Sequence, residues 1–157
     1  MQNRLKIEYR KYLGSTITRP LVEFQFGLSD VDQQVAHGNT LKGQKFTAIA
    51  LVDTGADGVF VKKAMLEACG CTKITGAGST PITWGDKAEI QSDLWMAHAY
   101  FPVIDRTIRF GVFDAVMDRQ DYQVILGTSF LEYGKATFDP KGESYFDFHP
   151  LQIPISG

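Results

Sequence analysis

The 157-residue chain is poor in the side chains that bind metals or form disulfides. It has only two cysteines, Cys69 and Cys71, and three scattered histidines, His37, His98 and His149. A disulfide between two cysteines that one residue separates would be strained, so we expect free thiols. The histidines lack the spacing of zinc ligands. We therefore expect no metal site and no cofactor.

The chain also lacks a strong net charge and a long hydrophobic run. Its formal charge is −2 and its isoelectric point is about 5.9, which gives no general attraction to nucleic acid or to anionic membranes. No apolar segment near either end is long enough to span a bilayer or to form the core of a signal peptide. We expect a soluble, cytoplasmic protein with no nucleic-acid or membrane partner.

Apolar residues make up 44% of the chain, enough for the core of one globular domain over residues 1–157. Most apolar runs are short or alternate with polar residues, which is typical of β-strands. Strands are predicted at residues 5–9, 20–28, 46–52, 59–61, 94–101, 108–113 and 122–126, with a hairpin over 136–148. Short helical segments are predicted at 62–69 and 128–133. With roughly eight or nine strands, the fold class is all-β, built as a small closed barrel.

Two further expectations concern the strand at residues 5–9 and the stretch between residues 72 and 84. The strand at 5–9 has a charged face, which suits the edge of a sheet. A second hairpin is predicted between residues 72 and 84, with Gly76, Ala77 and Gly78 at its tip. These glycines lack the Lys-Ser/Thr pair and the third glycine of a phosphate-binding loop, so we do not expect nucleotide binding.

The rest of the chain is organised around the stretch from residue 48 to residue 61. An apolar run ends at Asp53, a tight turn follows at Thr54 and Gly55, and a second apolar run begins at Val59. An acid is thereby presented on a loop between two buried strands. Taken alone, the same pattern also fits a plain β-turn in which Asp53 caps its own backbone.

Three features in this order resemble the retropepsins, the single-domain aspartic proteases of the retroviral type. They are the Asp-Thr-Gly-Ala-Asp run from Asp53 to Asp57, the glycine-rich hairpin at 74–82, and Ile125, Leu126 and Gly127 before a short helix. The resemblance covers about residues 20–140. It leaves an N-terminal extension at 1–19 and a C-terminal hairpin and tail at 141–157.

The resemblance implies an aspartic endopeptidase that cleaves peptide bonds in extended polypeptides and works as a homodimer. Hydrolysis without a metal needs one group that deprotonates a water and another that protonates the carbonyl oxygen. Two carboxylates that share one proton can do both. The chain has a single Asp-Thr-Gly, so a twofold dimer would have to bring two copies of Asp53 together.

The resemblance also assigns roles to the neighbours of Asp53. Thr54 would hydrogen-bond to the second copy, Gly55 would offer its carbonyl to the peptide, and Ala56 and Asp57 would line the substrate channel. Gly76, Ala77 and Gly78 would form a flap that covers the substrate. Support for the Asp53 loop would come from Ile125, Leu126 and Gly127 packed beneath it.

The chain departs from the family pattern at Thr128, where many viral members have an arginine that pairs with the acid corresponding to Asp57. The dimer sheet is a second open point, because either the strand at 4–10 or the tail around Ile153 would have to build it. Two alternatives to the enzyme stay open. One is a peptide-binding or regulatory module of the same fold without catalysis, and the other is a structural β-domain in which the Asp53 turn is only a turn.

Overall fold

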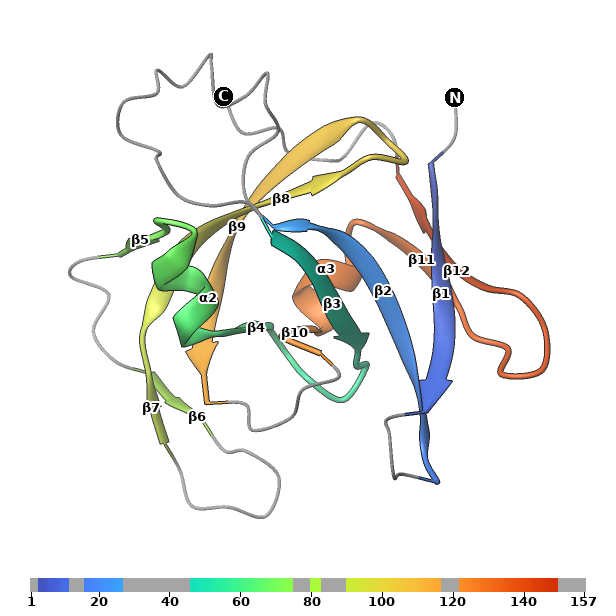
Figure 1. Ribbon diagram of the computed structural model, residues 1–157, viewed down its shortest axis with the longest axis horizontal. Helices are drawn as coiled ribbons and strands as arrows, with labels where there is room; N and C mark the ends of the chain where they lie inside the picture. The colour runs from blue at the N-terminus through green and yellow to red at the C-terminus, as the bar shows by residue number, and fades with distance from the viewer. Residues whose placement is uncertain are drawn as a thin grey trace.

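A closed six-stranded barrel forms the centre of the fold (Figure 1). The computed structural model describes residues 3–11, 16–26, 46–74, 80–82, 90–116 and 122–149. Neighbouring strands pair in the order β2-β3-β10-β4-β9-β8, and β8 pairs back to β2, which closes the ring. The barrel strands are β2 (Thr18–Phe26), β3 (Phe46–Val52), β4 (Val59–Lys62), β8 (Leu94–Phe101), β9 (Arg106–Ala115) and β10 (Val124–Leu126).

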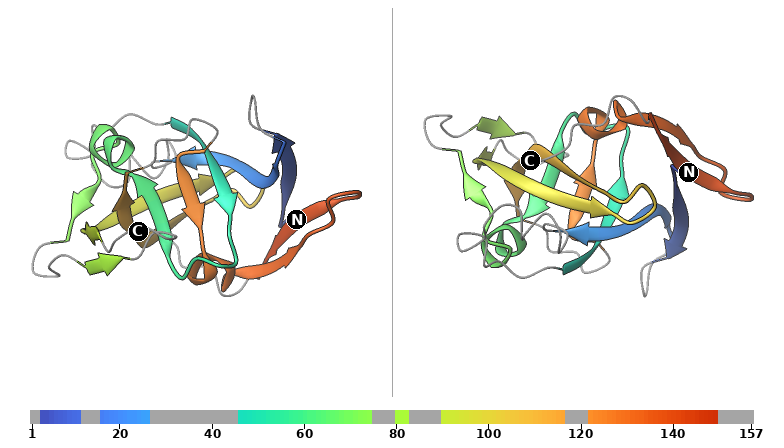
Figure 2. Two further views of the ribbon diagram at one scale, coloured as in Figure 1. Left: turned by 90° about the horizontal axis from the view of Figure 1, so that it is seen from below. Right: turned by 90° about the horizontal axis from the view of Figure 1, so that it is seen from above.

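The remaining elements surround this barrel. Strand β1 (Arg4–Lys11) pairs with β2 and with β12 (Ser144–Phe148), and β12 pairs with β11 (Gly134–Thr137). Strand β5 (Thr72–Lys73) pairs with β8, whereas β6 (Thr80–Ile82) and β7 (Ile90–Ser92) form a separate two-stranded sheet. The helices α2 (Lys63–Ala68) and α3 (Thr128–Leu131) are short. Figure 2 shows β1, β11 and β12 at one end of the molecule and β5 to β7 at the other.

The main core fills the inside of the barrel and continues under the terminal strands. Along β8 the side chains alternate strictly, so that every second residue is buried. Phe130 of α3 joins the two regions, because its ring contacts Phe101 of β8 as well as Phe146 and Phe148 of β12. The C-terminal hairpin is therefore attached to the barrel through an aromatic cluster that includes the helix after β10.

A second apolar cluster lies on the outer face of the barrel. The strand registers align one residue from each of five strands in a continuous row, in the order Leu21, Leu51, Ile125, Phe60 and Phe113. Residues in register on adjacent strands share a face and touch. This outer row explains why β3 is apolar on both faces, since one face supplies the core and the other supplies the row.

The structure confirms the all-β class, the small barrel and the two short helices. Twelve strands are described, rather than eight or nine. The expectation that the strand at 5–9 forms a sheet edge was wrong, because β1 lies between β12 and β2. Its charged side chains instead form ion pairs on the open face, such as Arg4 with Asp147 at 2.8 Å.

The hairpin expected over residues 72–84 was also wrong in its pairing. Strand β5 pairs with β8, and β6 pairs with β7, so the two predicted arms do not pair with each other. The hairpin of this region is β6–β7, which residues 83–89 connect. Gly76, Ala77 and Gly78 lie outside the described residues and stand between β5 and β6 in the sequence. Among the described helices, none is long and apolar enough to cross a membrane.

Candidate active site

Asp53 stands at the end of β3, where the chain leaves the barrel. Its backbone N–H donates to the carbonyl of Leu126 at 3.0 Å, which continues the parallel pairing of β3 with β10 by one residue. The N–H of Gly55 donates to the Asp53 carboxylate at 2.9 Å, and the N–H of Ala56 donates to the Asp53 carbonyl at 3.2 Å. Asp53 thus caps its own turn, as the plain turn interpretation expects.

The loop after Asp53 is held by the segment that follows β10. Four donors of residues 127–129 reach three consecutive carbonyls of the loop. The N–H of Thr128 donates to Ala56 at 2.8 Å, and the N–H of Gly127 donates to Gly58 at 3.0 Å. The carbonyl of Asp57 accepts both the N–H of Ser129 and the hydroxyl of Thr128, each at 3.0 Å. The loop conformation is therefore fixed by backbone contacts between segments about seventy residues apart in sequence.

Residue 127 must be glycine at this contact, because there is no room for a side chain. A Cβ atom there would overlap the carbonyl oxygens of Ala56 and Gly58 and lie 2.8 Å from the carbonyl carbon of Ala56. The two segments can approach closely enough to hydrogen-bond only because residue 127 has no side chain.

The side chains around the loop divide into an exposed polar set and a buried apolar set. Thr54, Gly55 and Asp57 are exposed, and Asp53 is partly exposed. Ile125 belongs to the outer apolar row, and Leu126 is part of the main core beneath the loop. Ala56 is half-buried and packs against the outer cluster. The Asp53 carboxylate thus reaches the surface between exposed polar residues and apolar residues that are buried.

Comparison with solved structures gives a match for the whole fold. The chain is similar to the crystal structure of a retropepsin-like aspartic protease from Rickettsia conorii, with a TM-score of 0.54 and 16% sequence identity. The match covers 94% of this chain and 96% of that one. The fold is retropepsin-like. No protein-family model matches the sequence. No curated protein matches it either.

Within this retropepsin-like fold, the structure brings together most of the residues that the sequence singled out. Asp53, Thr54, Gly55, Ala56 and Asp57 lie on one loop, and it rests on the segment that begins with Ile125, Leu126 and Gly127. Gly76, Ala77 and Gly78 lie outside the described residues.

The departure at Thr128 has a structural counterpart. Where many viral retropepsins have an arginine, the Thr128 hydroxyl donates to the main-chain carbonyl of Asp57. Among the described residues, no side chain forms a hydrogen bond or an ion pair with the Asp57 carboxylate. The loop is thus secured through its backbone, which leaves that carboxylate exposed.

Sequence reasoning missed the contributions of Gly58, Ser129 and Phe113. The carbonyl of Gly58 and the N–H of Ser129 complete the contact between the two segments. The ring of Phe113 lies 3.3 Å from the position that a Cβ of Gly58 would occupy, so it limits this side of the loop. No local pattern predicts these contacts, because each depends on pairing between distant strands.

Both cysteines are free thiols. Burial raises the pKa of the Cys69 thiol to about 12 and that of Cys71 to about 11, so both stay protonated near neutral pH. Among the described residues, no group of three or more His, Cys, Asp or Glu side chains is placed to hold a metal.

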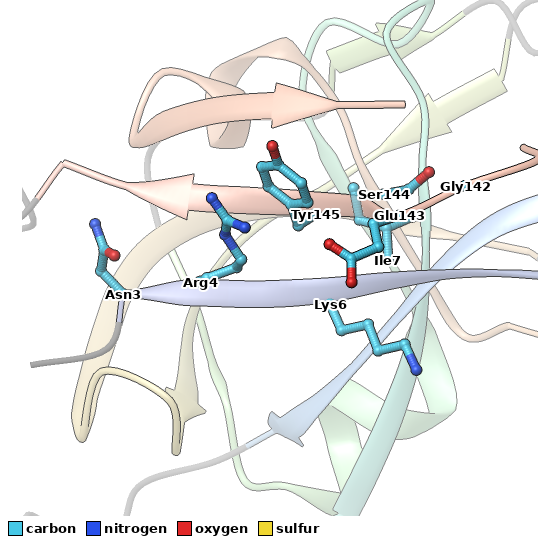
Figure 3. Close-up of a pocket in the computed structure, with 8 residues that line it drawn as sticks. All are labelled: Asn3, Arg4, Lys6, Ile7, Gly142, Glu143, Ser144 and Tyr145. Atoms are coloured by element: carbon cyan, nitrogen blue, oxygen red, sulfur yellow. The ribbon is translucent and has the colours of Figure 1, made fainter. Parts of the chain in front are cut away.

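A cavity of about 770 Å³ opens elsewhere, between β1 and the turn before β12 (Figure 3). Arg4 lies over the ring of Tyr145 there, with 3.6 Å between the guanidinium carbon and the ring centre. The same guanidinium pairs with Asp147. The lining includes neither Asp53 nor any residue bonded to its loop, so this cavity is separate from the candidate site.

Proposed function

We propose that this protein is an aspartic endopeptidase that hydrolyses peptide bonds in extended polypeptides. In this proposal two copies associate about a twofold axis, and their two Asp53 carboxylates share one proton. The observation that carries the proposal is the Asp53 loop itself. It presents a partly exposed carboxylate at the end of a barrel strand in a retropepsin-like fold, and backbone hydrogen bonds fix it.

The proposed chemistry needs no group beyond the two carboxylates and a water molecule. The ionised carboxylate takes a proton from the water molecule while the water oxygen attacks the peptide carbonyl carbon. The protonated carboxylic acid gives its proton to the carbonyl oxygen. Collapse of the tetrahedral intermediate breaks the C–N bond, and the leaving nitrogen takes a proton from the dyad. The products are a carboxylic acid and an amine.

The neighbouring residues support this chemistry in the proposal. Thr54 is exposed and would hydrogen-bond to the second copy, which would hold the two carboxylates in one plane. Gly55, Ala56 and Asp57 would contact the main chain of the peptide. The apolar row beside the loop would accept apolar side chains next to the cleaved bond.

The β6–β7 hairpin is better suited to cover the substrate than the segment containing Gly76, Ala77 and Gly78. It forms a sheet of its own and projects at the same lower end of Figure 1 as the loop between β3 and β4. We therefore propose the hairpin as the flap, with the glycine segment preceding it.

The dimer in this proposal does not use β1 as a free strand. Arg4 to Ile7 of β1 pair with β12, and Glu8 to Lys11 pair with β2, all within one chain. The tail around Ile153 lies outside the described residues. The exposed polar surface around Thr54 is where a second copy must approach if the two carboxylates are to meet.

The decisive experiment replaces Asp53 with Asn, which keeps the size of the side chain and an oxygen that can accept from Gly55. Wild type and Asp53→Asn are incubated with a peptide library from mildly acid to neutral pH, with and without a transition-state-mimicking inhibitor of aspartic proteases. Sedimentation reports the oligomeric state. We expect cleavage by a wild-type dimer that the inhibitor blocks, and no cleavage by the variant at unchanged mass.

Asp105→Asn is the matched control. Asp105 lies in the β8–β9 turn at the opposite end of the barrel and has a φ of 50°, a conformation that asparagine tolerates well. This control should cleave like wild type. An Asp53→Asn variant that still cleaves, or a wild type that stays monomeric while cleaving, would contradict the proposal.

A second candidate is a peptide-binding module of the same fold without hydrolysis. The hydrogen bond from Gly55 to the Asp53 carboxylate favours it, because the turn already uses one carboxylate oxygen within a single chain. This candidate requires a wild type that binds library peptides and leaves them intact at every pH.

A further inference from the structure

The side chain of Asp114 joins the end of β9 to the strand that returns from the β6–β7 hairpin. One carboxylate oxygen accepts the N–H of Asp93 at 3.3 Å and lies 3.1 Å from the hydroxyl of Ser92. The other accepts the indole N–H of Trp95 at 2.9 Å. A single carboxylate thus accepts two N–H groups and lies beside a hydroxyl, all within four consecutive residues.

Backbone contacts reinforce this cluster. The hydroxyl of Ser92 also lies 2.6 Å from the carbonyl of Asp114, and the N–H of Asp114 donates to the carbonyl of Asp93 at 3.1 Å. Ser92 and Trp95 are both buried. Because buried polar groups need partners, the loss of the Asp114 acceptors would leave donors unsatisfied and displace this segment.

The segment that leads from the barrel toward the β6–β7 hairpin is held by the same group of residues. The N–H of Ile74, just after β5, donates to the carbonyl of Leu94 at 2.9 Å. Lys73 forms an ion pair with Asp93 at 3.1 Å, and its ammonium lies 5.4 Å from the centre of the Trp95 ring. The chain therefore leaves the barrel and returns to it within one cluster. We call this cluster of Lys73, Ser92, Asp93, Trp95 and Asp114 the hairpin root.

The hairpin root is connected to the Asp53 loop by paired strands. Asp114 on β9 is in register with Val61 on β4, and β4 begins at Val59, directly after the Gly58 carbonyl that anchors the loop. The β6–β7 sheet has no strand pairing with the barrel among the described residues. Its orientation relative to the loop is therefore set at the root.

We propose that Asp114 is a positioning residue that orients the β6–β7 hairpin toward the Asp53 loop and so controls how tightly an extended peptide is held. This role rests on the proposed function. Asp114 takes no part in bond breaking. Its loss should weaken peptide binding and leave the chemical step nearly unchanged, whereas a merely structural carboxylate would affect stability alone.

The test compares Asp114→Asn and Asp114→Ala with the parent protein. The amide of Asn matches the carboxylate in size, but one of its two polar atoms is a donor and cannot accept from Trp95 or from the Ser92–Asp93 pair. Asp147→Asn is the matched control, because it removes a charge from the terminal sheet at the other end of the molecule. The chain has two tryptophans, so a Trp84→Phe background makes Trp95 the sole emitter.

Four readouts are needed. We expect the Asp93 amide to exchange about tenfold faster in Asp114→Asn, and the Trp95 emission to shift to longer wavelength. For a cleaved peptide, KM should rise by about tenfold with kcat within about threefold of the parent. In an Asp53→Asn background, which should not cleave the same peptide, the Asp114→Asn substitution should raise the dissociation constant of that peptide by the same factor. Asp114→Ala should exceed Asp114→Asn in each effect, and Asp147→Asn should show none of them.

Unchanged exchange and emission in both Asp114 variants would show that Asp114 does not hold the hairpin root in place. Altered exchange and emission without any change in KM or in the dissociation constant would overturn the positioning role and leave the proposed function intact. A wild type that cleaves no peptide would refute the proposed function. The dissociation constant, exchange and emission would still decide the role of Asp114 in that case, since none of them needs turnover.

Discussion

Replacing Gly127 with alanine tests whether the close contact between residues 127–129 and the Asp53 loop holds the site together. The added Cβ would overlap the carbonyl oxygens of Ala56 and Gly58, which are backbone atoms and cannot rotate away. Overpacking of this kind costs about 1–3 kcal/mol. The hydrogen bonds from Gly127 and Thr128 to the same two carbonyls would be lost or lengthened, at about 1 kcal/mol each.

The free energy of unfolding of Gly127→Ala should therefore fall by about 3–5 kcal/mol, a large part of the roughly 5–15 kcal/mol typical of a domain. Urea unfolding followed by tryptophan fluorescence measures this difference, and the slope of the transition checks that it stays two-state. If the proposed function holds, residual folded protein should also cleave poorly, because the loop that carries Asp53 must shift.

Gly111→Ala is the matched control for this substitution. Its Cβ would meet only the side chain of Leu94, with Cδ1 at 3.3 Å and Cγ at 4.0 Å, and that side chain can move. We expect a change within about 1 kcal/mol. A Gly127→Ala variant as stable as Gly111→Ala would refute the reasoning that close backbone approach fixes the loop.

Three further predictions concern the surroundings of the site. Thr128→Val removes the hydroxyl that donates to the Asp57 carbonyl and should lower the free energy of unfolding by about 0.5–1.5 kcal/mol; no loss in urea unfolding would show that the hydrogen bond contributes nothing. Phe130→Ala removes a side chain from a residue that is 2% exposed and surrounded by aromatic rings. Urea unfolding should show that the free energy of unfolding falls by about 3–5 kcal/mol. A fall of less than about 1 kcal/mol would contradict the role of this ring in joining the barrel to the C-terminal hairpin. Burial raises the pKa of the Cys71 thiol from 9.0 to about 11 and that of Cys69 to about 12. At pH 8, Cys71 should therefore react with a thiol-specific disulfide reagent about a hundredfold more slowly than in urea, and Cys69 about a thousandfold more slowly. Because the folded state keeps these protons while the unfolded state loses them, the free energy of unfolding should fall as the pH rises from 9 toward 12, and a cysteine-free variant should lack this part of the decline.

The local parts of the fold could be predicted from the sequence. Strand β3 was expected at residues 46–52 and has those bounds, since a continuous apolar run that ends in Asp-Thr-Gly is a strong local signal. Helix α2 ends before Gly70, whose φ of 70° suits glycine. The grouping of Asp53 with Ile125, Leu126 and Gly127 was also anticipated, although from a family resemblance rather than from any local pattern.

What failed was strand pairing, which depends on residues far apart. Residues 72–84 carry the strand–glycine–strand pattern of a hairpin, yet β5 finds its partner in β8 and β6 finds its partner in β7. Apolar content and turn residues cannot distinguish these pairings. The same limit explains why β1, with its charged face, was expected at an edge, since nothing local shows that β12, the last described strand, comes to lie beside it.

The position of β10 between β3 and β4 has a consequence for how the molecule is made. These two strands are neighbours along the chain but do not pair, because the parallel strand β10 separates them. The native barrel therefore cannot close during synthesis until residues 124–126 have left the ribosome and can insert between β3 and β4.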